Sequence, residues 1–137
     1  MVVGVLLLVV LTACGGEPPP ENLLEKSRQI PELSAFGALY LPLYEKAIVD
    51  SNWVPIRSNI RELMRLKARI TALDVPDNIR LKKNEWESNQ RLFARAVDNL
   101  AVVITWSGER EEANRVEIAE GVQRAYDWWQ MLVEMLR

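Results

Sequence analysis

The sequence RVEIAEGVQRAYDWWQMLVEMLR, residues 115–137, carries apolar side chains at successive steps of four, three, four, three and four. Steps of three and four place residues on one side of an α-helix. The residues on this side are Ile118, Val122, Ala125, Trp129, Leu132 and Leu136, widened by Ala119, Tyr126 and Val133. The pattern predicts an amphipathic helix over 109–136 that turns one face into a core.

Three earlier segments, about 31–50, 53–73 and 79–107, show the same spacing, and alternation typical of β-strands is absent. Short connections between helices favour antiparallel neighbours. The sequence therefore predicts an all-α, up-down-up-down four-helix bundle over 31–137, with a helical hairpin that dimerises into a bundle as the structural alternative. The core-facing residues of the three segments are Leu33, Phe36, Tyr40, Leu43 and Ala47; Ile56, Ile60, Leu63, Ile70 and Leu73; and Trp86, Phe93, Val97, Leu100 and Ile104.

The composition narrows the possible chemistry. Of the 137 residues, 26% are charged and the net charge is -2, which is not the basic excess of nucleic-acid-binding proteins, so no nucleic-acid partner is expected. The chain contains one cysteine and no histidine. Intrachain disulfides, Ser-His-Asp and Cys-His catalytic groups and imidazole metal ligands are thereby excluded. We expect no enzymatic activity, no cofactor and no metal site.

The N-terminus resembles that of a bacterial lipoprotein precursor. An apolar run over 2–11 is too short for a transmembrane helix of about 20 residues but suits a signal peptide. The tetrapeptide Leu11-Thr12-Ala13-Cys14 that follows resembles a lipobox. The resemblance implies cleavage before Cys14 and attachment of diacylglycerol, with further fatty acylation, to that residue.

The residues after Cys14 are typical of a tether. Gly15-Gly16 and Pro18-Pro19-Pro20 would interrupt a buried helix, which argues against the alternative that Met1 to Cys14 is a core helix with an incidental cysteine. We therefore expect a signal peptide over 1–13, a lipidated cysteine and tether over 14–30, and the bundle after them.

Two details of this N-terminus concern location and start site. Gly15 stands where an aspartate would retain such a lipoprotein at the inner membrane, so the resemblance implies the outer membrane if the source is Gram-negative. No Lys or Arg precedes the apolar run, although signal peptides normally begin with positive charge, and we expect translation to start upstream of Met1.

A second resemblance concerns the helices. The segment FGALYLPLYEKA, residues 36–47, together with Tyr126-Asp127-Trp128-Trp129, is similar to small exported four-helix proteins related in shape to cytochrome c-prime. The resemblance implies histidines near Pro42 and in the last helix, where this chain has Tyr40, Tyr44 and Gln123. The covalent haem motif is also missing, so the resemblance implies a scaffold that has lost its usual ligands.

Two sets of residues are candidate partner contacts. Arg57, Arg61, Arg65 and Arg69 recur every four residues and form one row of guanidinium groups that suits phosphates, acidic lipids or an acidic partner. The alternative is a solvated row, paired loosely with nearby carboxylates. Trp128 adjoins Trp129 on a helix, so both cannot point into one core; Trp128 either faces outward or fills a groove between helices.

These features favour a membrane-tethered, non-enzymatic binding or scaffolding lipoprotein of the cell envelope, facing the periplasm or the exterior. Its partners would be the membrane, through the lipid on Cys14, and an envelope protein or surface polymer. The alternative is a small-ligand or metal carrier with a pocket between the helices near Tyr40, Tyr44, Trp86 and Tyr126. Catalysis by a carboxylate pair alone ranks last, because nothing in the sequence marks a cleft.

Overall fold

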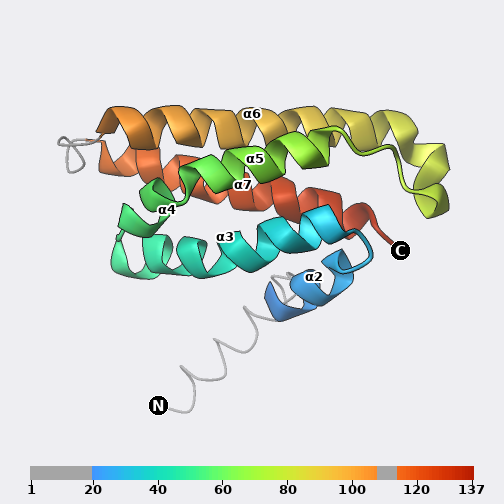
Figure 1. The fold of residues 1–137 in the computed structure, drawn as a ribbon, viewed down its shortest axis with the longest axis horizontal. Helices are drawn as coiled ribbons and strands as arrows, with labels where there is room; N and C mark the ends of the chain where they lie inside the picture. Colours follow the sequence, from blue (N-terminus) through green and yellow to red (C-terminus); the bar gives the residue numbers. More distant parts are fainter. Residues whose placement is uncertain (1–19, 108–113) are drawn as a thin grey trace, which may run out of the picture.

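The computed structural model describes residues 20–107 and 114–137, and within these ranges the regular secondary structure is entirely helical (Figure 1). The predicted all-α fold class is confirmed. The signal peptide, Cys14 and the residues before Pro20 lie outside the described residues. The elements are α2 (Pro20–Ser27), α3 (Pro31–Asp50), α4 (Val54–Ser58), α5 (Ile60–Thr71), the 3-10 helix η1 (Asp77–Lys82), α6 (Lys83–Ser107) and α7 (Arg115–Met135).

The predicted and observed helices differ mainly at their ends and at one break. Helix α3 has the predicted bounds, whereas the segment predicted over 53–73 is divided into α4 and α5 at Asn59. The Asn59 side chain donates a hydrogen bond to the Pro55 carbonyl at 2.8 Å, and its backbone N–H bonds to the Ile56 carbonyl. An asparagine side chain that competes for backbone groups in this way interrupts an α-helix.

The third predicted helix begins later than the periodicity indicates. Ile79 has a non-helical φ of -129°, and regular α-helix starts only at Lys83, after η1. The fourth helix, α7, is described from Arg115, and residues 109–113 of the predicted segment lie outside the described residues.

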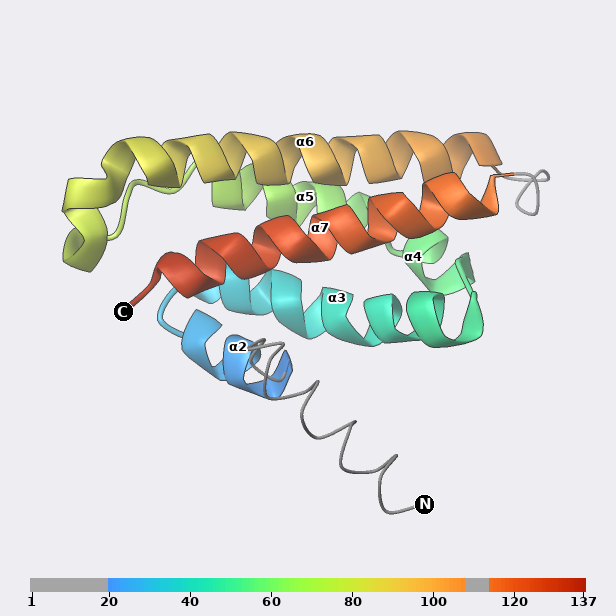
Figure 2. The ribbon, with the colours of Figure 1, turned by 180° about the vertical axis from the view of Figure 1, so that it is seen from behind.

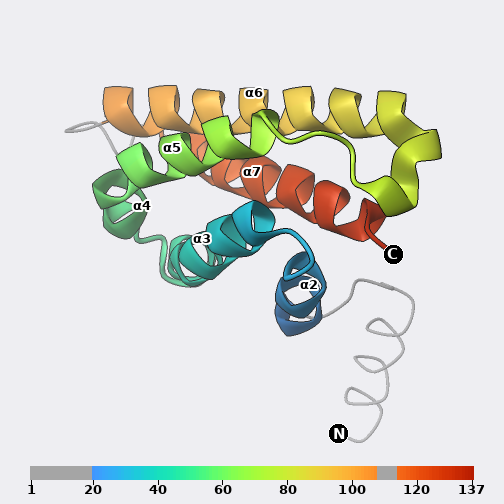
Figure 3. The same ribbon diagram turned by 45° about the vertical axis from the view of Figure 1, so that its right-hand side comes forward.

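The long helices pack in a closed order. Helix α3 packs against α5 and α7, and α6 packs against the same two helices. Figures 1 and 2 show α6 and α3 on opposite sides, with α5 and α7 between them on the two faces. Helix α2 lies against α3 and α7, on the side of the molecule away from α6 (Figure 3).

The segment assigned to the tether, 14–30, therefore contains a helix that packs on the folded unit. Leu23 of α2 is only 2% exposed and joins the main core cluster. The Lys26 ammonium also donates to the Glu134 carbonyl near the end of α7, at 3.4 Å. The core consequently extends at least to Leu23.

The predicted apolar stripes account for most of this core. All six residues of the α7 seam, all five of the α3 stripe and all five of the α6 stripe are buried. Lys67, which interrupts the α5 stripe, is half-buried and bonds to the Asp98 carboxylate of α6 at 2.8 Å. None of the described helices combines the length and the apolar character needed to cross a membrane.

Candidate functional site: an apolar groove above a tyrosine cluster

The three tyrosines of the chain meet where α3 faces α7. Tyr40 is 1% exposed and donates its hydroxyl to the Val122 carbonyl at 2.7 Å. The Tyr44 hydroxyl lies 2.8 Å from Gln123 Oε1, and the Tyr44 ring stacks on that of Tyr126 with centroids 4.4 Å apart. Tyr40, Tyr44 and Gln123, which occupy the positions where the haem-protein resemblance implies histidines, thus lie together in space.

The hydrogen bonds of this cluster join helices to each other. Burial raises the pKa of the Tyr40 hydroxyl well above its ordinary value, and the nearby Tyr44 and Asp127 raise it further. Tyr40 is therefore protonated at neutral pH and donates to a backbone carbonyl. Tyr126 is buried as well, at 7% exposure. These side chains fill the α3–α7 interface.

We expect Tyr40→Phe to lower the free energy of unfolding by about 1 kcal/mol at pH 7, because one buried hydrogen bond is lost. Since burial raises the folded-state pKa, the contribution of Tyr40 is complete below its unfolded pKa of about 10 and falls as pH rises beyond it. Urea unfolding of both chains between pH 7 and 11 should show two stability curves that converge at high pH. A constant difference up to pH 11 would contradict burial of this hydroxyl.

A second hydrogen bond joins α3 and α7, this time with the donor on α7 and the acceptor on α3. Trp129 of α7 is fully buried, and its indole N–H donates to the Leu33 carbonyl of α3 at 2.9 Å. The indole passes directly over Gly37, where a Cβ atom would overlap with Trp129 Cζ2 and would lie 3.1 Å from Leu24 Cδ1. Glycine is required here because the two helices approach so closely.

The outer side of α3 carries a groove of about 390 Å³ directly above this interface. Leu24 of α2 borders one edge, and Glu45 is the only ionisable carboxylate or amine among the lining residues. Ile48 and Val49 are 42% and 73% exposed. The lining residues are Leu24, Gly37, Ala38, Leu41, Pro42, Tyr44, Glu45, Ile48 and Val49.

Of the groove residues, only Tyr44 was predicted from the sequence as part of a binding site. The stripe of α3 already explains Leu33, Phe36 and Tyr40 as core residues, so the remaining apolar residues of the helix were left without a role. The sequence does contain a sign of the groove, because α3 has more apolar residues than its core stripe needs. Leu41, Ile48 and Val49 lie off the stripe, so α3 is apolar on more than one side. A helix that is apolar all round is normally covered.

Known proteins offer no assignment for this site. The sequence matches no protein-family model, and the comparisons with curated proteins and with solved structures found no match either. The chemical interpretation therefore depends on the geometry of the chain itself.

Trp86, the fourth residue of the predicted pocket, lies apart from the tyrosines. It is fully buried on α6 and makes no ring contact with Tyr40, Tyr44 or Tyr126. Within the described part of the chain its indole N–H has no hydrogen-bond acceptor. The structure thus brings together three of the four predicted pocket residues, and the cluster they form is packed.

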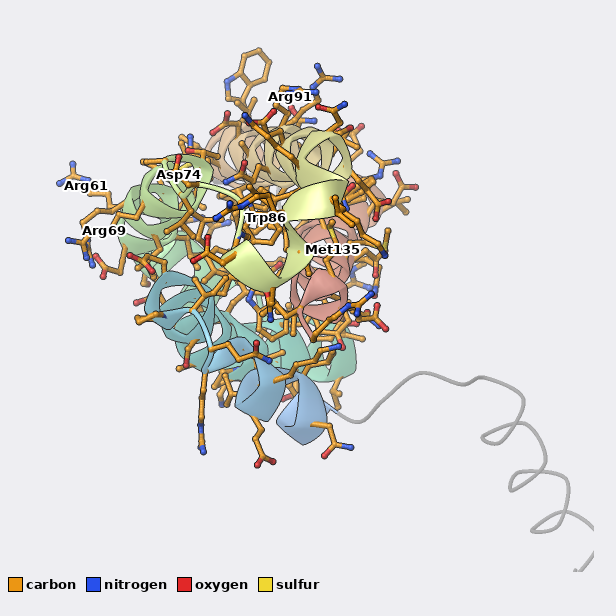
Figure 4. All side chains as sticks on the ribbon, turned by 90° about the vertical axis from the view of Figure 1, so that its right-hand side faces the viewer. Arg61, Arg69, Asp74, Trp86, Arg91 and Met135 are labelled. Atoms are coloured by element: carbon orange, nitrogen blue, oxygen red, sulfur yellow. The ribbon has the colours of Figure 1, made fainter. Side chains whose placement is uncertain are left out.

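The arginine row divides into a half-buried end and an exposed remainder. Arg57 reaches the Ile104 carbonyl of α6 at 3.4 Å. Arg65 bonds to Glu62 at 2.8 Å, which lowers the pKa of that exposed carboxylate. Arg61 and Arg69 are exposed and make no hydrogen bond or ion pair with the described residues; Figure 4 shows both projecting outward from α5.

The other candidate residues, Trp128 and Gln123, contact neighbouring side chains of the domain. Trp128 is half-buried and packs against the core, which agrees with the groove-filling alternative. The Gln123 amide bridges Tyr44 and the Asp127 carboxylate, which it contacts at 2.9 Å. Over 20–107 and 114–137, no group of three acidic or cysteine side chains is close enough to hold a metal ion.

Proposed function

We propose that this protein is a membrane-tethered, non-enzymatic binding or scaffolding module of the cell envelope, held by lipid on Cys14. Its domain would be an up-down-up-down four-helix bundle with α2 as an added helix. The observation that carries the binding role is the outward pair Arg61 and Arg69, two exposed guanidinium groups that make no hydrogen bond or ion pair with the described residues, although the charge of Arg69 acts on Glu62. Unpaired charge on a rigid helix is available to another molecule.

The chemistry of the partner follows from the arginine row. Arg61, Arg65 and Arg69 are spaced by four residues, so their attachment points span about 12 Å along one side of α5. Arginine binds carboxylate and phosphate groups through two parallel hydrogen bonds. The proposed partner is therefore an envelope protein or surface polymer with several anionic groups in a row.

The position of the lipid supports a tethered arrangement. Five residues separate Cys14 from Pro20, the first residue of α2. Because α2 packs on α3 and α7, the anchor would enter the folded unit directly, without a long flexible linker. An outer-membrane location, with the domain in the periplasm or outside, remains the proposal for a Gram-negative source.

The alternative function, a small-ligand or metal carrier, has less support. Its binding site between the helices coincides with space that Tyr40, Trp129 and Tyr126 fill. A ligand inside the bundle would have to displace these side chains and break the bonds to Leu33 and Val122. We therefore place the binding surface on the outside of the domain.

The proposed contact can be tested by photo-cross-linking in cells. A photoreactive amino acid in place of Ala68, which is exposed on α5 between Arg65 and Arg69, should form a discrete adduct with a partner. The double substitution Arg61→Glu/Arg69→Glu should abolish this adduct, since it reverses both unpaired charges.

The matched control is Arg91→Glu/Arg95→Glu, which reverses two exposed arginines on α6 and should leave the adduct unchanged. Thermal unfolding followed by circular dichroism checks that both double variants fold. Absence of an adduct at position 68, or equal loss in both double variants, would refute a specific role for the row.

A further inference from the structure

The outer face of α3 is an apolar surface without a cover in the described chain. It contains the groove with Leu41, Ile48 and Val49, of which Ile48 and Val49 are exposed. Contiguous exposed apolar surface of this kind usually marks contact with a protein or a membrane.

The tether would keep α2, and the helices on which it packs, close to the bilayer. The six residue steps from Cys14 to Pro20 reach at most about 20 Å when fully extended. Leu24, at the edge of the groove, follows Pro20 by one helical turn, or about 6 Å. Helix α3 itself is about 30 Å long, so a lipid on Cys14 cannot hold the α3 side far from the membrane.

From these observations we infer that the outer face of α3 docks on the phospholipid bilayer when Cys14 is lipidated, with the groove residues at the boundary between headgroups and acyl chains. The inference rests on the proposed function, because the lipid supplies proximity. A single tether converts docking into an intramolecular step, so a weak apolar contact is populated. The occupant is the lipid surface, which the anchor brings within reach of this face.

The charges around the groove indicate which lipid headgroups are needed for docking. Along the outer part of α3, Glu45 and Asp50 are offset by Lys46 only in part, so this face does not depend on anionic lipid. Docking should therefore occur on zwitterionic phosphatidylcholine and change little with salt. In this orientation α6 faces away from the membrane, and the arginines of α5 project to the side (Figure 4).

Spin labels at two positions test the inference. The lipidated full chain, purified from membranes and reconstituted in phosphatidylcholine vesicles, carries a label at Ile48→Cys or, as the matched control, at Arg95→Cys on the opposite helix α6. The readout is the ratio of label collisions with oxygen, which enriches in lipid, to collisions with a water-soluble nickel chelate. We expect this ratio to be several-fold higher at position 48 than at position 95.

Adding Leu41→Glu/Val49→Glu should reduce the ratio at position 48 to the control value. If that chain fails to fold, Val49→Glu alone serves, because Val49 is 73% exposed. Equal ratios at 48 and 95 in the lipidated chain would overturn the inference. So would a label at 48 that is immobilised in native envelopes but aqueous in lipid vesicles, which would assign the face to a protein partner.

Failure of the anchor is distinguishable from failure of docking. A Cys14 thiol without lipid would take up a second spin label, visible as an added mass on the intact chain. That result would refute the proposed tether and the docking that depends on it, whereas a single label with equal ratios refutes docking alone.

Discussion

Replacing Gly37 with alanine is expected to destabilise the domain by about 2 kcal/mol, although glycine to alanine in a helix ordinarily stabilises by about 0.5–1 kcal/mol. The new Cβ would overlap with Trp129 Cζ2 and lie 3.0 Å from Cη2. Trp129 is fully buried and bonded to Leu33, so its ring cannot easily move. Forced overpacking of a core costs roughly 1–3 kcal/mol and at times more, which outweighs the helix-propensity gain.

Two further substitutions make this prediction specific. Gly121→Ala is the matched control, because a Cβ there has its nearest neighbour at an ordinary 3.5 Å, on Leu100, and should stabilise by about 0.5–1 kcal/mol. Trp129→Phe removes the overlapping ring atoms, so Gly37→Ala should cost little in that background. Urea unfolding followed by far-ultraviolet circular dichroism measures the parent chain, the three single variants and the Gly37→Ala/Trp129→Phe double variant. Additive effects of the Gly37 and Trp129 changes would contradict the packing described.

Replacing Gln90 with leucine is expected to lower the free energy of unfolding by about 2 kcal/mol. Gln90 is 6% exposed, and its side-chain amide donates to the carbonyls of Ile70, at 2.8 Å, and Leu73, at 2.9 Å. These carbonyls belong to the last turn of α5 and the residues after it, where helical partners run out. Leucine fills similar space but removes this donor. The Ile70 carbonyl still accepts the Leu73 backbone N–H, at 3.2 Å, whereas the Leu73 carbonyl loses the Gln90 donor, and a buried acceptor left unpaired costs about 1–3 kcal/mol.

Gln123→Leu provides the comparison for this second prediction. Gln123 is also a glutamine on a long helix, but it is half-buried and bonds to side chains, those of Tyr44 and Asp127, rather than to helix-end carbonyls. Those partners can turn to water, so the loss should stay below about 1 kcal/mol. Similar unfolding midpoints for the two leucine variants would show that Gln90 does not cap α5 in the manner described.

Periodicity was sufficient to predict the long helices and most of the core, whereas α2 was assigned to the tether. The seam of α7 and the stripes of α3 and α6 follow from spacing alone, because an apolar face with a period of 3.6 residues must be covered. The break at Asn59 and the late start of α6 were not predicted, because both depend on local backbone competition that leaves the apolar spacing intact.

The candidate site was predictable only in part. Tyr40, Tyr44 and Tyr126 do meet, but sequence reasoning expected a pocket where the structure has hydrogen bonds and stacked rings. Whether aromatic residues line a cavity or fill it depends on helix separation, which Gly37 sets and which spacing does not encode. The groove on α3 was missed for a different reason: most of its apolar residues lie outside the core stripe, and Leu24 of α2 covers only one edge.

The four arginines of the row can be distinguished only in the folded structure. Four guanidinium groups at equal spacing look equivalent in sequence, yet Arg57 is half-buried against α6 while Arg61 and Arg69 are exposed. The break between α4 and α5 separates the first arginine from the others. Partner contact is therefore proposed for the α5 arginines only.

The central claim, that lipid on Cys14 holds this domain at a membrane, is tested most directly by mass spectrometry of the N-terminal peptide of the protein purified from membranes. We expect a peptide that begins at Cys14 and carries diacylglycerol in thioether linkage. A peptide that retains residues before Cys14, or one whose Cys14 thiol is free, would contradict it.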